Sequence, residues 1–303
     1  MQTTIADLRQ FFRPYVTVLR ENTRKFKHAV KAKVRPYTRV NTLHRDLQET
    51  GSLLTLRAAG PLGRAGDSLI LPDDKIICPH VLRFAAWDYA NIQAFCAHVD
   101  REKAYILLDI GANIGLFSRQ IERCIPKLQK LICIEPDVAN FRALQYNLAH
   151  IRDRVEFCNI ALGDADEDRE MFRDADNIGN YSLNPDAMRD RQFDTAKVRV
   201  RDTRSWMAKA QDGSTPLLWK SDTQGFDELI VSATPIELWH RIDVALIEIW
   251  RIAKPNFDRD AFRLRLESFP NRQLDDKPDV SPDEILTYLS GNDYTHKDLL
   301  MWR

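Results

Sequence analysis

The sequence lacks the marks of a membrane-embedded or secreted protein. No apolar run approaches the roughly 18 residues that a membrane-spanning helix needs. The first residues, MQTTIADLRQ, show no charged segment followed by an apolar stretch, so we expect no secretory signal. The five cysteines are odd in number and widely spaced, which is typical of reduced thiols. These absences predict a cytoplasmic protein.

The ligand spacing of a closed zinc site is also missing. Cys78-Pro-His80 and Cys96-Ala-His98 repeat a C-x-H pattern, whereas closed sites more often use C-x-x-C or H-x-x-x-H. We therefore predict no metal. Internal repeats and low-complexity tracts are absent too, and a hydrophobic fraction of 44% is enough for a substantial core.

Charge is distributed unevenly. The net charge is zero, yet residues 1–45, the basic leader, hold eleven Lys/Arg and two Asp/Glu, a net charge of +9, which leaves −9 for the remainder. Apolar residues recur in the leader at helical spacing, and Pro14 separates a short helix from a longer one. Three roles stay open: packing on its own domain or a partner subunit, docking on the inner face of an anionic membrane, and nucleic-acid contact. No RNA-binding signature accompanies the charge, so nucleic acid is not an expected partner.

From residue 101 onward strands and helices alternate, which predicts a mostly parallel sheet with helices on both faces. We divide the chain into a basic helical extension (1–48), a strand-and-helix cap region (49–100) and a main α/β domain (101–303). Ser281-Pro-Asp-Glu284 is a capping box. The expected strands cover 106–110, 131–135, 155–162, 217–222, 243–250 and 294–302, and the expected helices cover 81–98, 115–124, 137–149 and 202–210, with another from 226.

One strand–turn–helix–strand segment carries the strongest functional signal. An apolar strand ends in Asp109, the turn Gly111-Ala-Asn113-Ile-Gly115 opens a helix, and a second apolar strand ends in Glu135. This order places the turn and the acidic residue at the carboxyl ends of parallel strands, where open α/β sheets bind nucleotides. The glycines let the backbone approach a ligand, and Glu135 can accept two hydrogen bonds from ribose hydroxyls. We therefore predict a nucleoside-bearing cofactor.

The spacing of this turn excludes two classes of nucleotide site. A dinucleotide fingerprint needs G-x-G-x-x-G, but Asn113 and Leu116 stand where the second and third glycines would be. No lysine follows the glycines, which excludes a P-loop. The turn suits a ligand without pyrophosphate, such as the amino-acid end of S-adenosylmethionine. The alternative is an ordinary βαβ unit in which Asp109 caps the helix and Glu135 is a solvated strand end.

A second cluster, Lys220-Ser-Asp222-Thr-Gln224-Gly, closes a later apolar strand. Alternate side chains of a strand share a face, so Lys220 and Asp222 point the same way at its carboxyl end. The next strand carries Glu248 in a comparable position. All three should edge the same cleft as Glu135.

Methyl transfer is the chemistry that these residues suggest. A sulfonium loses its positive charge as the methyl moves, so the enzyme mainly aligns donor and acceptor, and orientation can contribute roughly 7–11 kcal/mol. An alcohol acceptor must also lose its proton. We expect Asp222 to be the base and Glu248 the second candidate, while Lys220 holds Asp222 ionised or positions the acceptor. A buried network that merely satisfies strand ends is the alternative.

At these motifs the chain resembles the FkbM-type S-adenosylmethionine-dependent methyltransferases. The resemblance covers roughly residues 101–250, with weaker echoes around Trp87-Asp88 and in the closing strand. The matching stretches, in order, are LLDIGANIGLFS, IEPDVANFRALQYNL, NIALGD, GNYSL and LLWKSDTQGFDELI.

The resemblance implies a Rossmann-like class I methyltransferase fold, with a seven-stranded sheet whose last strand is antiparallel. Members of the family usually methylate hydroxyls, often on sugars or polyketide-type natural products. We therefore expect an O-methyltransferase that uses S-adenosylmethionine, releases S-adenosylhomocysteine and takes a sugar or glycoconjugate hydroxyl as acceptor. The implied cofactor contacts are Asp109, Gly111, Asn113, Gly115, Glu135 and, near the adenine, Asn159.

The chain departs from the family at one site position. The family often has D-x-E-G where this chain reads Asp222-Thr-Gln224-Gly, and a glutamine cannot act as a base or as a strong metal ligand. The basic leader also lies outside the resemblance. Alternatives that stay open are a polyketide, lipid or protein acceptor, a non-catalytic cofactor-binding partner subunit, and a dehydrogenase.

Overall fold

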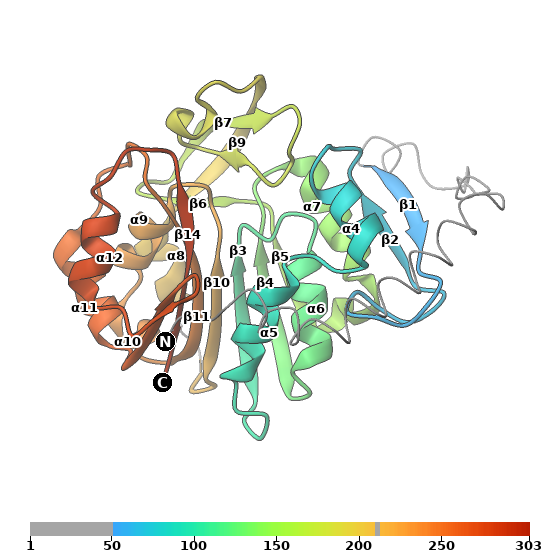
Figure 1. Cartoon of the computed structure of the whole chain (residues 1–303), viewed down its shortest axis with the longest axis horizontal. Helices are drawn as coiled ribbons and strands as arrows, with labels where there is room; N and C mark the ends of the chain where they lie inside the picture. The colour runs from blue at the N-terminus through green and yellow to red at the C-terminus, as the bar shows by residue number, and fades with distance from the viewer. Residues whose placement is uncertain (1–50, 210–212) are drawn as a thin grey trace, which may run out of the picture. The chain divides into compact units, whose positions relative to one another are not determined.

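The computed structural model describes residues 51–209 and 213–303, all within one compact unit, Leu43–Arg303. The basic leader, with its expected helices and roles, lies outside the described residues. In the described part, helices flank a central sheet and a smaller sheet stands at one end of it (Figure 1).

The central sheet has the strand order β13-β12-β14-β11-β10-β3-β4-β5. The strands from β5 to β11 are parallel, and β14 runs antiparallel between β11 and β12. This is the class I methyltransferase sheet that the resemblance implied, with its antiparallel last strand. The strands are β3 (Tyr105–Ile110), β4 (Leu128–Ile134), β5 (Val155–Cys158), β10 (Leu217–Ser221), β11 (Ile242–Trp250), β12 (Asn271–Leu274), β13 (Lys277–Pro278) and β14 (His296–Trp302).

The expected count of seven strands in this sheet is wrong by one. A two-residue strand, β13, pairs with the end of β12 at the sheet edge. The hairpin forms because Asp275, between the two strands, adopts a left-handed conformation with φ 49°, which turns the chain back on itself.

Successive residues of the central strands pack on opposite faces, as the strand period of two requires. In β3, Leu107 belongs to the core under α5 and α6, whereas Leu108 belongs to the core that includes α9 and α11. The predicted capping box of α12 is confirmed. The helices are α4 (Ile77–Phe84), α5 (Tyr89–Ala97), α6 (Leu116–Cys124), α7 (Val138–Asn147), α8 (Thr203–Lys209), α9 (Asp227–Ala233), α10 (Ile236–Trp239), α11 (Arg259–Glu267) and α12 (Pro282–Tyr288), with 3₁₀ turns at Ala149–Arg154 and Pro185–Met188.

A single strand over 155–162 is not what the structure shows. The chain leaves the central sheet after β5 and begins β6 (Ala161–Gly163), which belongs to a separate sheet of order β6-β9-β7-β8. The break falls at Asn159, whose side-chain amide donates to the carbonyl oxygens of Glu135 and Pro136. The other strands of this sheet are β7 (Glu167–Asp174), β8 (Tyr181–Ser182) and β9 (Phe193–Asp202).

The expected single helix over 81–98 is likewise wrong. Two helices, α4 and α5, replace it, because Ala85 and Asp88 adopt left-handed conformations with φ 52° and 46°. The chain therefore turns between the helices, and this turn reaches the carboxyl end of the central sheet. Trp87 is half-buried beside it.

The first described strands, β1 (Ser52–Thr55) and β2 (Ser68–Leu71), form a hairpin that packs on α7. Asn147 of α7 holds this contact, because its side chain accepts from the Ile70 amide at 2.7 Å and donates to the Ile70 carbonyl at 2.9 Å. The cap region is thus fixed on the helix that follows β4.

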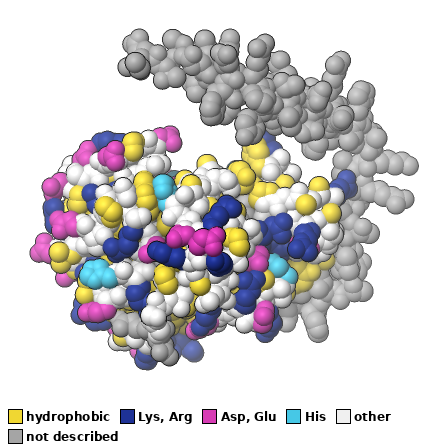
Figure 2. All heavy atoms as spheres, turned by 90° about the horizontal axis from the view of Figure 1, so that it is seen from below, with side chains coloured by type: hydrophobic (Ala, Val, Ile, Leu, Met, Phe, Trp, Pro, Cys, Tyr) yellow, Lys and Arg dark blue, Asp and Glu magenta, His cyan; other side chains and the backbone are white. Residues whose placement is uncertain are grey.

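Acidic and basic side chains are interspersed on the face seen in Figure 2. Lys127–Glu102 and Lys130–Glu156 are examples of exposed ion pairs between acidic and basic side chains. Within residues 51–209 and 213–303 no helix is both long and apolar enough to cross a membrane. All five cysteines are free, as their spacing predicted.

Candidate active site

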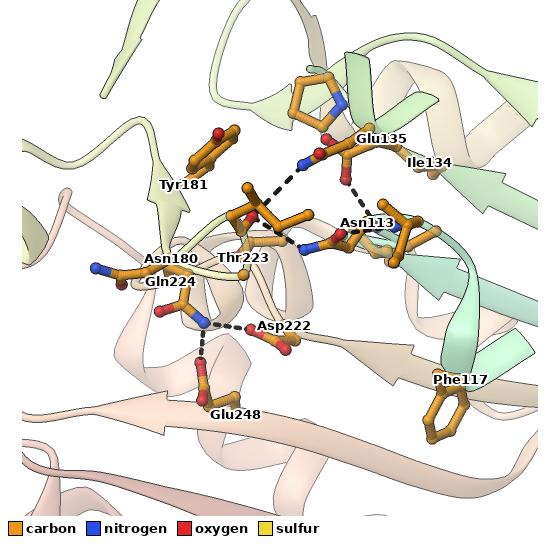
Figure 3. Close-up of a pocket in the computed structure, with 18 of the residues that line it drawn as sticks. Asn113, Phe117, Ile134, Glu135, Asn180, Tyr181, Asp222, Thr223, Gln224 and Glu248 are labelled. Carbon is orange, nitrogen blue, oxygen red and sulfur yellow. Dashed lines mark hydrogen bonds between the residues drawn. The ribbon is translucent and has the colours of Figure 1, made fainter. Parts of the chain in front are cut away.

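A cavity of about 300 Å³ opens at the carboxyl ends of β3, β4, β10 and β11. This volume is within the usual range for small-molecule sites. The turn between α4 and α5 and the loops of the smaller sheet complete its walls. Six of the residues expected from the sequence line it: Gly111, Asn113, Glu135, Lys220, Asp222 and Glu248. Figure 3 labels four of them, Asn113, Glu135, Asp222 and Glu248.

Three expected cofactor residues do not line the cavity and support it from behind. Asp109 accepts a hydrogen bond from the Ser118 hydroxyl at 2.6 Å and is fully buried. Asn159 secures the chain after β4 through the carbonyl contacts described above. Gly115 has φ 81°, and a Cβ there would lie 2.6 Å from Leu144, so a glycine lets α6 begin against α7.

The glycine turn is shaped by a close backbone approach. Gly111 has φ 72°, and a Cβ at this position would lie 2.0 Å from the carbonyl oxygen of Asp222. Asn113 also has a left-handed backbone, with φ 51°, and its backbone amide donates to Glu135 at 2.8 Å. Only a residue without a side chain fits at 111, so the turn that follows β3 is built directly on the loop that follows β10.

Glu135 presents a buried carboxyl group to the cavity. Its two oxygens accept from the backbone amides of Asn113 and Asp137, at 2.8 and 2.9 Å. Burial raises the pKa of Glu135 to about 8, and the nearby charge of Asp137 acts in the same direction. In the ionised form each carboxyl oxygen has a second lone pair, so the carboxylate can still accept from two hydroxyl groups of a ligand.

Lys220 joins the two sides of the cavity. Its Nζ donates to the Gly111 carbonyl oxygen at 2.6 Å and lies 3.3 Å from Asp109 and 4.0 Å from Asp222. Burial opposes the charge of Lys220, but the carboxylates of Asp109 and Asp222 outweigh it and raise the pKa above its ordinary value. The side chain is therefore a fixed cation, and it is no proton acceptor at neutral pH.

Glu248 and Asp222 differ in their surroundings. Glu248 accepts from the Trp250 indole at 2.6 Å, and His296 lies 3.7 Å away. Burial, followed by the neighbouring charge of Asp222, raises the pKa of Glu248 well above its ordinary value. The Asp222 side chain keeps 38% of its surface exposed. Asp222 is thus the freer carboxylate, and Glu248 is the acid that retains a proton.

Sequence reasoning missed Asp88 as a cavity residue. It precedes α5 in a left-handed conformation, and its side chain does not cap the helix. Burial and the charge of Asp298 raise the pKa of Asp88 to about 7. The sequence signal for this residue was the weak family resemblance around Trp87-Asp88. Trp250 and His296 also line the cavity and no motif indicated them, whereas Asn180 and Tyr181 belong to the GNYSL stretch.

The candidate zinc residues are not brought together. His80 packs against Phe84 and Trp87, and His98 stacks on Trp302 with ring centroids 3.7 Å apart. Among the residues that the structure describes, no group of three or more His, Cys, Asp or Glu side chains is arranged to hold a metal ion.

No family model and no curated protein matches the chain. Solved structures do. One is a methyltransferase FkbM from Methylobacillus flagellatus, with 15% identity and a TM-score of 0.39 over 66% of this chain and 44% of that one. It carries the family name that the sequence motifs suggested. This chain therefore spans less than half of that protein's length.

Two further structures are similar at the same distance. Cofactor-bound Rv0187 from MTB has 14% identity and a TM-score of 0.36, over 73% of this chain and 83% of that one. The mitomycin 7-O-methyltransferase MmcR has 12% identity and a TM-score of 0.33, over 71% and 53%. The fold of this chain rests on its own strand order.

Proposed function

We propose that this protein is an S-adenosylmethionine-dependent O-methyltransferase. One observation carries the proposal: a single cavity has Glu135 and the glycine turn on one side and Asp222 with Glu248 on the other (Figure 3). The first set suits a nucleoside with an amino-acid end. The second set suits a hydroxyl that must lose a proton. We call these two sides the donor side and the acceptor side.

The donor side fits the cofactor by its backbone. Asn113 and Gly111 adopt left-handed conformations and line the cavity. In its ionised form Glu135 has two free lone pairs for the ribose hydroxyls, and the turn has no lysine to bind a pyrophosphate. When bound, S-adenosylmethionine supplies an electrophilic methyl group on a sulfonium.

The acceptor side supports proton removal by Asp222. Asp222 would take the proton of the acceptor hydroxyl, whose oxygen would receive the methyl group as the carbon–sulfur bond breaks and S-adenosylhomocysteine leaves. Lys220 stabilises the ionised form of Asp222 from 4.0 Å. Glu248, whose pKa is raised by burial, is suited to donate a hydrogen bond to the acceptor at neutral pH.

A sugar or glycoconjugate is the acceptor class that we propose. Trp87, Trp250 and Tyr181 line the cavity, and aromatic faces pack well against the apolar faces of sugar rings. Asp88 and Asn180 add groups for further hydroxyls. An acceptor with several hydroxyl groups would use all of these, whereas a wholly apolar acceptor would leave them unpaired.

Two measurements test the proposal. Thermal unfolding should shift upward with S-adenosylhomocysteine and not with a nicotinamide dinucleotide; the reverse result would identify a dinucleotide enzyme. Labelled S-adenosylmethionine supplied with sugar-bearing extracts should then label a glycan fraction. Label in a polyketide, lipid or protein fraction instead would keep the methyl transfer and replace the acceptor.

A further inference from the structure

Gln224 lies between the two candidate acids of the acceptor side (Figure 3). Its Nε2 atom is 2.5 Å from Oδ1 of Asp222 and 2.6 Å from Oε2 of Glu248. One amide nitrogen carries two hydrogens, so each carboxyl group receives one of them. The opposite assignment of the amide would place its oxygen, an acceptor, against both carboxyl groups.

The backbone of Gln224 adopts an unfavourable conformation. Its φ is 55°, which is uncommon for a residue other than glycine. Its carbonyl oxygen accepts from the Ser182 hydroxyl of β8 at 2.7 Å, and the residue is 6% exposed. Strained backbone that a neighbouring strand fixes is expected where the position of a side chain matters.

In the part of the chain that the structure describes, Lys220 lies beside Asp222 but does not take over this role. Lys220 is shared among Asp109, Asp222 and the Gly111 carbonyl, so it does not separate Asp222 from Glu248. The other charged groups around Asp222 and Glu248 are mostly acids. They are Asp88 before α5, Asp227 of α9 and Asp298 of β14. His296 of β14 and the Trp250 indole of β11 also face Glu248.

We propose that Gln224 is the positioning residue of the acceptor side, because its amide nitrogen donates to Asp222 and Glu248 at once and fixes both carboxyl groups in the cavity. Where the measurement is enzymatic turnover, this inference rests on the proposed function. A glutamate at position 224 would bring a third acid and remove one fixed donor. Neighbouring acids would then share protons, and Asp222 would be ionised only at higher pH.

The test compares Gln224→Glu and Gln224→Met with the wild type over a range of pH. For Gln224→Glu we expect kcat at pH 7 to fall about tenfold, with the acidic limb of the profile moved up by about one pH unit and most activity regained at pH 9. For Gln224→Met we expect a lower kcat at every pH and an unchanged KM for the donor. Gln273→Glu on β12, outside the cavity, makes the same change of charge and should match the wild type.

A purely structural role would give a different result. Both variants would then lose activity equally at all pH values and bind S-adenosylhomocysteine less well, and the proposal would be wrong. A Gln224→Glu profile identical to that of the wild type would also overturn it.

A second readout does not depend on turnover. Infrared difference spectra across the pH range follow the protonated carboxyl band, and Asp222→Asn and Glu248→Gln assign its parts. We expect Gln224→Met to change the titration of these two acids. If it does so in a protein that methylates no acceptor, the proposed function fails and the role of Gln224 stands. An unchanged titration rejects the role of Gln224, whatever the turnover.

Discussion

The donor side and the acceptor side of the cavity are built in different ways. The donor side comes from one stretch of chain, from Gly111 to Glu135, in which a strand, a turn, a helix and a strand follow each other. The acceptor side is assembled from the ends of distant elements, from Asp88 to His296. A ligand held by backbone leaves a compact pattern in the sequence. A ligand held by side chains from several strand ends does not.

The largest expected effect separates the two sides at the base. Asp222→Asn should lower kcat by about 10²–10⁴-fold, because the amide cannot take the hydroxyl proton. Binding of S-adenosylhomocysteine, measured by calorimetry, should stay as in the wild type. Asp153→Asn, an exposed position outside the cavity, is the control. A parallel loss of donor affinity would mean that the two sides are not separable.

The next effect is expected where the two sides touch. Gly111→Ala places a Cβ 2.0 Å from the Asp222 carbonyl oxygen at a φ of 72°, so the free energy of unfolding should fall by roughly 3 kcal/mol or more, and donor binding should be lost. Gly66→Ala has a similarly unfavourable φ of 93° in open space and should cost about 1 kcal/mol. Chemical denaturation measures both. Equal losses would show that backbone strain alone, and not the contact, limits position 111.

A smaller effect should be confined to the donor side. Glu135→Gln replaces an acceptor of backbone and ribose hydrogen bonds, so affinity for S-adenosylhomocysteine should fall roughly tenfold to a hundredfold. At a saturating donor concentration kcat should change little. Glu156→Gln, an exposed position on the neighbouring strand β5, serves as the control. A kcat loss as large as that of Asp222→Asn would place Glu135 in the chemical step.

The smallest effect concerns the pH dependence of stability. The pKa of Asp88 is raised from 3.8 to about 7, so the folded state holds this proton more tightly than the unfolded state does. Ionisation therefore destabilises the fold as pH rises from about 4 to 7. Asp88→Asn avoids this, and its advantage in unfolding free energy should grow over that window to about 2 kcal/mol and then level off.

Asp190→Asn is the matched control for this experiment. Asp190 has the same left-handed conformation, with φ 59°, on an exposed loop. Its stability difference from the wild type measures the effect of this substitution in a left-handed turn, and the difference for Asp88→Asn is compared with it at each pH. A difference for Asp88→Asn that does not change with pH would indicate that Asp88 is ionised in the folded protein throughout.

The sequence predicted the glycine turn and the positions of most central strands because both depend on local patterns, whereas the class I arrangement of the sheet was implied by the family resemblance. Gly111 and Asn113 are residue types that tolerate a left-handed backbone, so the sequence indicates the turn. The spacing of Glu135 from the turn indicates its place at the end of the next strand. The break after β5 was missed because it depends on Asn159 meeting carbonyl oxygens of another strand. The turn at Ala85 was missed because alanine gives no warning of a left-handed conformation.

The acceptor side was predicted only where strand ends carry acids. Asp222 and Glu248 follow from the register of β10 and β11, whose parallel pairing brings their carboxyl ends together. Asp88 and His296 reach the cavity through a turn and an antiparallel strand, and neither position can be placed without tertiary contacts. Gln224 was visible as a departure from D-x-E-G, but the two hydrogen bonds that it donates were not.

The contact between Gly111 and the Asp222 carbonyl gives this architecture a practical consequence for redesign. The joint between the two sides consists of main-chain atoms, together with the Lys220 hydrogen bond to the Gly111 carbonyl. The side chains of Trp250 and His296, beside Glu248, lie outside that joint. If the proposed function holds, a library that varies those two positions can therefore search for new acceptors while the donor side stays unchanged.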